Sequence, residues 1–152
     1  MIRTAGVNDV DGIVELRIKL LHEINTNAGQ YDWAAYARAL KDFLCMGLSQ
    51  GTAIAYLAEE QESIVAFTLM CFGRCIPLLS DFDGKTALLT DMYTAPPYRR
   101  RGVGTALLSR TMEQAKSLGY KKVILHATES GRALYQNYGF RDVSGEMAYK
   151  FQ

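Results

Sequence analysis

The residues whose types and spacing most clearly suggest a chemical function form a glycine-rich turn with several positive charges. They lie in the stretch "PPYRRRGVGTALLSRTMEQAKSLGY". Arg99 to Arg101 precede Gly102 and Gly104, and an amphipathic segment follows. The first turn of a helix has unbonded N–H groups, and its dipole presents about half a positive charge. Glycine, which has no Cβ, lets the backbone come close to phosphate oxygens. The pattern therefore indicates a phosphate-binding turn at the start of a helix.

Two familiar nucleotide motifs do not fit this turn. A P-loop requires G-x-x-x-x-G-K-S/T, and no lysine follows the glycines here. The dinucleotide fingerprint G-x-G-x-x-G requires a third glycine, and that position is Leu107. Taken alone, the turn is also compatible with a tight strand-to-helix connection whose arginines are merely solvated.

The turn does not stand alone, because it resembles the acetyl-coenzyme A signature of the GCN5-related N-acetyltransferase (GNAT) superfamily. That signature is R/Q-x-x-G-x-G/A, directly after the fourth strand, and Arg99-x-x-Gly102-x-Gly104 matches it. A second family hallmark is a later helix of the form A-x-x-L-Y-x-x-x-G-F. The stretch "ALYQNYGF" (133–140) matches its end, with alanine beside leucine instead of set back.

The elements that position these motifs follow from hydrophobic periodicity. The sequence predicts strands at 1–5, 52–60, 62–73, 86–95, 121–128 and 146–152, and helices at 10–21, 33–44, 102–118 and 130–139. Asn8 or Asp9 is expected to cap the first helix, and Asp32 the second. The stripe of the first helix comprises Val10, Ile13, Val14, Leu16, Arg17, Leu20 and Leu21.

This order of elements predicts an α/β fold. With the resemblance, it implies a GNAT-type acyl-CoA N-acyltransferase fold, with a mixed central sheet of about six strands flanked by helices on both faces. We expect residues 1–152 to form a single N-acetyltransferase domain. The strand at 86–95 is apolar on both faces near its start, which favours a central position in the sheet.

The resemblance also implies an activity and a set of site residues. The activity is transfer of the acetyl group of acetyl-CoA to a primary amine of a small molecule or peptide, without a covalent enzyme intermediate. Main-chain groups on the fourth strand are expected to bind the pantetheine arm, and those of the turn the pyrophosphate, with arginine charge at the rim. The implied cofactor-binding residues are Met92, Tyr93, Thr94, Arg99, Arg100, Arg101, Gly102, Val103, Gly104 and Thr105. Thr128 stands where many members have an asparagine that holds pantetheine, so that contact is not carried over.

The chemistry needs a base, an oxyanion donor and an acid. An alkylammonium with a pKa of about 10.4 must lose a proton before it attacks, and the leaving thiolate has a thiol pKa of about 8.5. Tyr135 occupies the position of the family's acid and is expected to protonate the thiolate. Asp91 is the candidate base, although it could equally cap a turn or pair with an arginine. Glu23 is a poorer base, and His22 and His126 are expected to be structural.

Composition limits the partners. The formal net charge of +1 disfavours a nucleic-acid binder. Hydrophobic residues make up 49% of the chain, but no apolar stretch reaches the roughly 20 residues of a membrane helix. With no signal peptide evident, we expect a cytoplasmic protein. No metal site is expected, because the three cysteines lack suitable spacing and are expected to be buried thiols. Dimerisation is common in the family, and nothing in the sequence decides it.

The acceptor amine is expected between the first two helices and the later loops, at 20–33 and 74–85. These segments contain acidic and aromatic residues that suit a cationic substrate such as a polyamine, an aminoglycoside or a peptide N-terminus. The residues are Glu23, Tyr31, Asp32, Trp33, Asp81 and Asp83. Two alternatives remain open at this point: a non-catalytic acyl-CoA-binding sensor or docking module of the same fold, and an RNA-binding domain that uses Arg99 to Arg101.

Overall fold

The computed structural model describes residues 1–143 and 145–151. Its strands and α-helices are β1 (Ile2–Thr4), α1 (Val10–Ile24), α2 (Trp33–Gln50), β2 (Ala53–Glu60), β3 (Ser63–Arg74), β4 (Lys85–Thr94), α3 (Val103–Ser117), β5 (Val123–Leu125) and α4 (Glu129–Tyr138). Short 3₁₀ turns occupy Val7–Asp9, Ala28–Gln30 and Pro96–Tyr98. The predicted order of elements is confirmed from β1 to α4.

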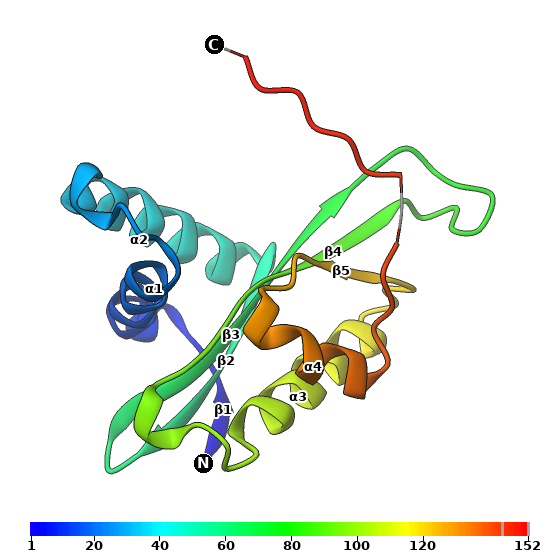
Figure 1. Ribbon diagram of the computed structural model, residues 1–152. Helices are drawn as coiled ribbons and strands as arrows, with labels where there is room; N and C mark the ends of the chain where they lie inside the picture. The colour runs from blue at the N-terminus through cyan, green and yellow to red at the C-terminus, as the bar shows by residue number, and fades with distance from the viewer. Residues whose placement is uncertain (144, 152) are drawn as a thin grey trace.

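The strands form one mixed sheet in the order β1-β2-β3-β4-β5. Neighbouring strands are antiparallel except β4 and β5, which are parallel. Helices α1 and α2 cover one face of the sheet, and α3 and α4 cover the other (Figure 1). The predicted α/β fold with helices on both faces is therefore confirmed, as is the interior position of β4 between β3 and β5.

The prediction of about six strands was wrong by one within the described residues. Of the expected last strand at 146–152, residues 146–151 are described; they are not paired with another strand and extend away from the sheet (Figure 1). Met147 and Tyr149 are 96% and 81% exposed. Alternating apolar residues satisfy the period of a strand, but a strand also needs a hydrogen-bonding edge. The neighbouring β5 has three residues, so it offers a short edge.

Each face of the sheet has its own hydrophobic core. Between the sheet and α1 and α2, the buried residues include Ile13, Leu16, Leu44, Leu57 and Phe67. Between the sheet and α3 and α4 they include Met70, Leu89, Leu108 and Ala115, with Tyr135 packed against them. Because side chains alternate along a strand, β4 carries residues toward both cores, which places its two faces in different chemical surroundings.

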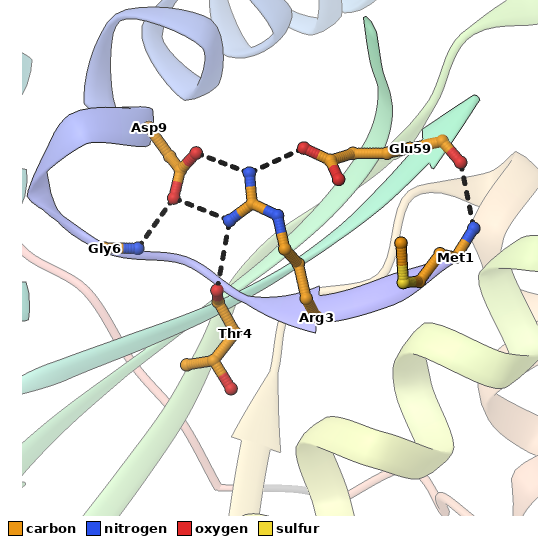
Figure 2. A network of polar contacts seen from close by, with 6 residues as sticks. All are labelled: Met1, Arg3, Thr4, Gly6, Asp9 and Glu59. Atoms are coloured by element: carbon orange, nitrogen blue, oxygen red, sulfur yellow. Dashed lines mark hydrogen bonds and ion pairs between the residues drawn. The ribbon is translucent and has the colours of Figure 1, made fainter. Parts of the chain in front are cut away.

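Local signals in the sequence account for most element boundaries. Asp32 caps α2 by accepting a hydrogen bond from the Ala35 amide at 2.9 Å, as predicted. Asp9 precedes α1, but its carboxylate makes no capping bond to that helix. It accepts instead from the Gly6 amide and from Arg3, which also binds Glu59 on β2 (Figure 2). Arg3 thus ties β1 to β2 and to the start of α1.

Among the described residues, no helix has the length and apolar character needed to cross a bilayer. The cysteines are free thiols there, but the expectation that all are buried was wrong. Cys75 is exposed, because it begins the long connection between β3 and β4, whereas Cys45 and Cys71 are half-buried.

Candidate active site

The glycine-rich turn leads from β4 into α3, as the sequence predicts. Arg100 has a φ of 65° and Gly102, the N-cap residue of α3, has a φ of 79°. A positive φ is unusual for an arginine and indicates a turn held in a specific conformation. The first amide of this region that bonds to the helix is that of Ala106, which donates to the Gly102 carbonyl at 3.0 Å. The amides of Val103, Gly104 and Thr105 have no backbone partner in the described chain and can bind an anion.

Gly104 lies where three elements meet. A Cβ at this position would stand 3.6 Å from Leu134 Cδ2, 3.8 Å from Met92 Cε and 3.9 Å from Thr94 Oγ1. These are ordinary contact distances, so the glycine is not required by the packing of the fold itself. Because Gly104 has no Cβ, a ligand can approach the first-turn amides of α3 more closely here than beside any other residue. The turn therefore offers backbone donors to an anionic ligand.

The strand β4 has a bulge and an open edge next to this turn. Leu69 on β3 pairs with Asp91 and Met70 pairs with Leu89, so Thr90 is the extra residue. Pairing with β5 ends at Leu89, which faces Leu125. Beyond that point the main-chain groups of β4 that face away from β3 have no strand partner in the described chain. An extended amide-containing ligand can therefore hydrogen-bond to β4 there.

Tyr135, on α4, packs in the core cluster that includes Leu89 and Met92 of β4. Its hydroxyl makes no hydrogen bond within residues 1–143 and 145–151, and its ring packs edge-on against Phe140 with centroids 5.9 Å apart. Burial raises the pKa of the Tyr135 phenol, and the nearby charge of Asp91 raises it further. The phenol is therefore kept protonated and free to donate. Tyr138, one helical turn on, is 40% exposed and so lies at the surface.

Thr128 holds the start of the helix that carries Tyr135. Its hydroxyl accepts a hydrogen bond from the Gly131 amide at 3.2 Å and so caps α4. Gly131 also makes room for the catalytic candidate, since a Cβ there would lie 3.3 Å from Tyr135 Cε2. The residue that departs from the family pattern therefore has a structural role in this chain.

Replacing Thr128 with alanine is expected to lower the stability of the protein by about 1 kcal/mol, because the cap is lost. For a chain of this size the midpoint of thermal unfolding should fall by about 2–4 °C, measured by circular dichroism. Thr128→Asn and Thr128→Ser, which keep a capping oxygen, serve as matched controls and should unfold close to the wild type. An alanine variant as stable as these controls would contradict the capping role.

Asp91 and Arg17 form a largely buried ion pair between β4 and α1. Arg17 Nε donates to Asp91 Oδ2 at 2.8 Å, and the Asp91 side chain is 5% exposed. The sequence left the Asp91 carboxylate open as a base or as a partner of an arginine, and the structure identifies the arginine. It leaves Oδ1 as the oxygen not bound by Arg17.

A second polar cluster joins the turn to α1. Glu23 accepts hydrogen bonds of 2.6 Å from the Tyr93 hydroxyl and from Arg99, which also donates to the Thr94 carbonyl. Burial acts to raise the pKa of Glu23, but the bonds from Tyr93 and Arg99 outweigh it and the pKa is lowered. For Tyr93, burial and the bond to Glu23 raise the pKa to about 12. Both oxygens of Glu23 are occupied, so it is poorly placed to act as a base.

The structure brings together only part of the expected acceptor region. His22 stacks on Trp33 with ring centroids 4.2 Å apart, and Tyr36 lies edge-on to Trp33, so aromatic side chains gather between α1 and α2. Asp32 serves as a helix cap. Asp81, in the β3–β4 connection, forms an ion pair with Lys121 just before β5 and accepts a hydrogen bond from the Asp83 amide.

Sequence reasoning missed Arg17 and Tyr36 as residues of this site. The available signal was an arginine inside the otherwise apolar stripe of α1. A charged residue in such a stripe needs a buried partner, and here that partner is Asp91. His126 lies at the surface, 3.5 Å from Glu146. In the described part of the chain, no three His, Cys, Asp or Glu side chains are grouped so as to hold a metal ion.

Comparison with known proteins agrees with the geometry. A profile of the acetyltransferase (GNAT) family matches residues 18–140. The uncharacterized N-acetyltransferase YhfO of Bacillus subtilis (strain 168) is 26% identical over 152 residues, spanning 97% of this chain and 94% of that protein. A crystal structure described as a predicted acetyltransferase with acetyl-CoA, from Clostridium acetobutylicum, has a TM-score of 0.89 and 27% identity, covering 99% of this chain and 95% of that one. A GCN5-related N-acetyltransferase from Ralstonia eutropha JMP134 has a TM-score of 0.88 and 25% identity, covering 99% and 97% of the two chains.

The match of the family profile covers most of the chain, from α1 to the end of the motif that contains Tyr135. The two solved structures extend the agreement to nearly the whole fold. The chain belongs to the acetyltransferase (GNAT) family and is an enzyme of the N-acetyltransferase class.

Proposed function

We propose that the protein transfers the acetyl group of acetyl-CoA directly to a primary amine of a small molecule or peptide, in a complex that contains both substrates. Residues 1–152 are assigned to one catalytic domain. The observation that carries this proposal is that α3, β4 and α4 meet at Gly104, next to groups that have no partner within the described residues. These groups are the first-turn amides of α3, the edge of β4 beyond Leu89 and, one residue from Leu134, the Tyr135 hydroxyl.

The cofactor-binding part of the proposal rests on the main chain. The amides from Val103 to Thr105 are assigned to the diphosphate, with the charge of Arg100 and Arg101 at its rim. The main chain of β4 from Met92 to Thr94 is assigned to the pantetheine arm. The sequence led us to expect Arg99 to bind only the cofactor, but its side chain has another partner. It binds Glu23, and so links this turn to the acceptor side.

Acetyl-CoA supplies an activated thioester, at which a C–N bond to the amine forms as the C–S bond breaks. Tyr135 is assigned as the general acid that donates its phenolic proton to the departing sulfur. Its raised pKa suits this role, because the phenol remains protonated at neutral pH. The protonated phenol of Tyr135 is thus available as the proton donor without help from another side chain.

The proton of the amine needs a separate acceptor. Asp91 is proposed for this role through its Oδ1, since its Oδ2 is bound by Arg17. The charge of Asp91 contributes, after burial, to the raised pKa of the Tyr135 phenol, which is consistent with an acid and a base that act on the same substrate. Glu23 is not assigned, because both of its oxygens accept hydrogen bonds.

Release of free thiol tests this function directly. The purified chain is mixed with acetyl-CoA and a panel of amines that includes amino acids, polyamines, aminoglycosides and peptides, and each acceptor is checked for the mass of one added acetyl group. We expect release that depends on both the protein and an amine. Tight binding of coenzyme A, measured by calorimetry, without release for any amine would instead support an acyl-CoA sensor of the same fold.

A further inference from the structure

Arg17 on α1 has hydrogen-bonding capacity that the protein does not use. A guanidinium group has five N–H donors. Nε donates to Asp91, but the two terminal nitrogens make no hydrogen bond within residues 1–143 and 145–151. The Arg17 side chain is 22% exposed, so most of it is covered by the surrounding protein. Unused donors on a partly buried cation point to a ligand that accepts hydrogen bonds.

Tyr36 on α2 provides a second unused donor beside the first. Its ring centroid lies 5.7 Å from the Arg17 guanidinium carbon. Its hydroxyl is buried and has no partner in the described part of the chain. A buried hydroxyl without a hydrogen bond is rare, because it forgoes its hydration without compensation. A ligand group that accepts from both Arg17 and Tyr36 accounts for the two donors together.

Other arginines of this protein show what such a group can be. Arg3 binds two carboxylates at once, those of Asp9 and Glu59 (Figure 2). Arg99 is occupied by Glu23 and the Thr94 carbonyl. Arg17 has one carboxylate, Asp91, bound through Nε, and its terminal nitrogens bind no protein group within the described residues.

The charges around the site favour a ligand with both signs. Arg17 is balanced by Asp91, and Arg99 is balanced by Glu23. A primary amine arrives protonated at neutral pH. A molecule that carries one amine and one carboxylate adds no net charge to this half-buried region. A polyamine adds two or more positive charges, and the nearby carboxylates are already paired.

We propose that the acetyl acceptor carries a carboxylate in addition to its amine, and that the terminal nitrogens of Arg17 and the hydroxyl of Tyr36 bind this carboxylate. The inference rests on the proposed function, because it names the acceptor class for that reaction. The acceptor is therefore an amino acid or a related amino carboxylate. Arg17 and Tyr36 determine its selection over amines that lack the acid group.

The test compares three pairs of compounds that differ only by the carboxylate: alanine and ethylamine, γ-aminobutyrate and n-propylamine, and L-lysine and cadaverine. For each compound, kcat/KM is measured by thiol release, and binding to the protein saturated with coenzyme A is measured by calorimetry. We expect the acid to be preferred by about tenfold or more in at least one pair, as for a hydrogen-bonded charged group.

Three variants test whether Arg17 and Tyr36 cause the preference for compounds that carry a carboxylate. In Arg17→Lys, which keeps the charge beside Asp91, and in Tyr36→Phe, which removes only a hydroxyl, the preference should shrink several-fold while coenzyme A still binds. Arg38→Lys, an exposed arginine on α2, is the control and should keep the wild-type preference. Thiol release with equal use of acid and decarboxylated amine in every pair overturns the inference and leaves the proposed function intact. Selective binding of an acid with no release from any amine overturns the proposed function instead.

Discussion

Replacement of Tyr135 by phenylalanine is expected to lower kcat by about 10²-fold or more, the typical contribution of a positioned general acid. The substitution removes one hydroxyl that makes no hydrogen bond within the described residues, and it leaves the ring contact with Phe140 in place. The fold and the affinity for coenzyme A should therefore change little. Steady-state kinetics with a responsive amine, together with calorimetric titration of coenzyme A, measure the two quantities separately.

The pH dependence of kcat gives this prediction a sign. The protonated phenol is the active form of the acid, so activity is lost only as the pH rises through the pKa of Tyr135. Burial and the charge of Asp91 raise that pKa above its usual value of about 10. Tyr135 should therefore produce no falling limb in kcat below about pH 10.

Tyr138→Phe is the matched control for Tyr135→Phe, because Tyr138 lies one turn further along α4 and is 40% exposed. Its kcat should equal that of the wild type. If Tyr135→Phe also retains full kcat, the sulfur is protonated by solvent and Tyr135 is only a packing residue. A simultaneous loss of coenzyme A affinity would show that the hydroxyl binds the cofactor rather than acting as an acid.

The fold could be predicted from the sequence because local sequence signals mark most of its helices and strands. Hydrophobic period, the cap at Asp32 and glycines such as Gly51 and Gly139 define the helices, and the polar turn after Glu60 defines the β2–β3 hairpin. The prediction of a last strand at 146–152 was wrong for a reason that is not local in the sequence. Its alternating residues are those of a strand, but whether they join a sheet depends on an edge that the local pattern does not describe.

The site was predictable to the extent that it depends on the main chain. The turn from Arg99 to Thr105 has a glycine, Gly102, at a left-handed backbone position, and a glycine is visible in a sequence. The partners of side chains are not. Asp91 is paired with Arg17, which lies 74 residues away in the sequence, and Arg99 turns toward Glu23 on α1 instead of lying only at the cofactor rim. These pairings depend on how α1 packs against β4. The sequence could therefore indicate acidic residues in the expected acceptor region, but not that arginines neutralise their charge.

Replacement of Gly104 by leucine is expected to weaken coenzyme A binding by about 10- to 100-fold for each phosphate hydrogen bond lost, since a bond to a charged group contributes about 1.5–3 kcal/mol. The leucine side chain would project from the first turn of α3, where the Cβ position lies 3.8 Å from Met92 Cε on β4 and 3.6 Å from Leu134 Cδ2 on α4. A diphosphate could then no longer approach the amides of that turn. Calorimetric titration of coenzyme A measures the effect without any need for turnover.

Two further variants distinguish the effect of a side chain at position 104 from the effect of the positive charge of the turn on coenzyme A binding. Gly104→Ala adds a Cβ at ordinary contact distances, the nearest atom being 3.6 Å away, so the variant should fold like the wild type and bind with an intermediate loss. Arg100→Ala removes an exposed charge, whose contribution is about 0.2–1 kcal/mol, and should weaken binding by only a few-fold. If Arg100→Ala proves more damaging than Gly104→Leu while both variants remain folded, the phosphates are bound by side-chain charge, and the proposed role of the α3 amides is wrong.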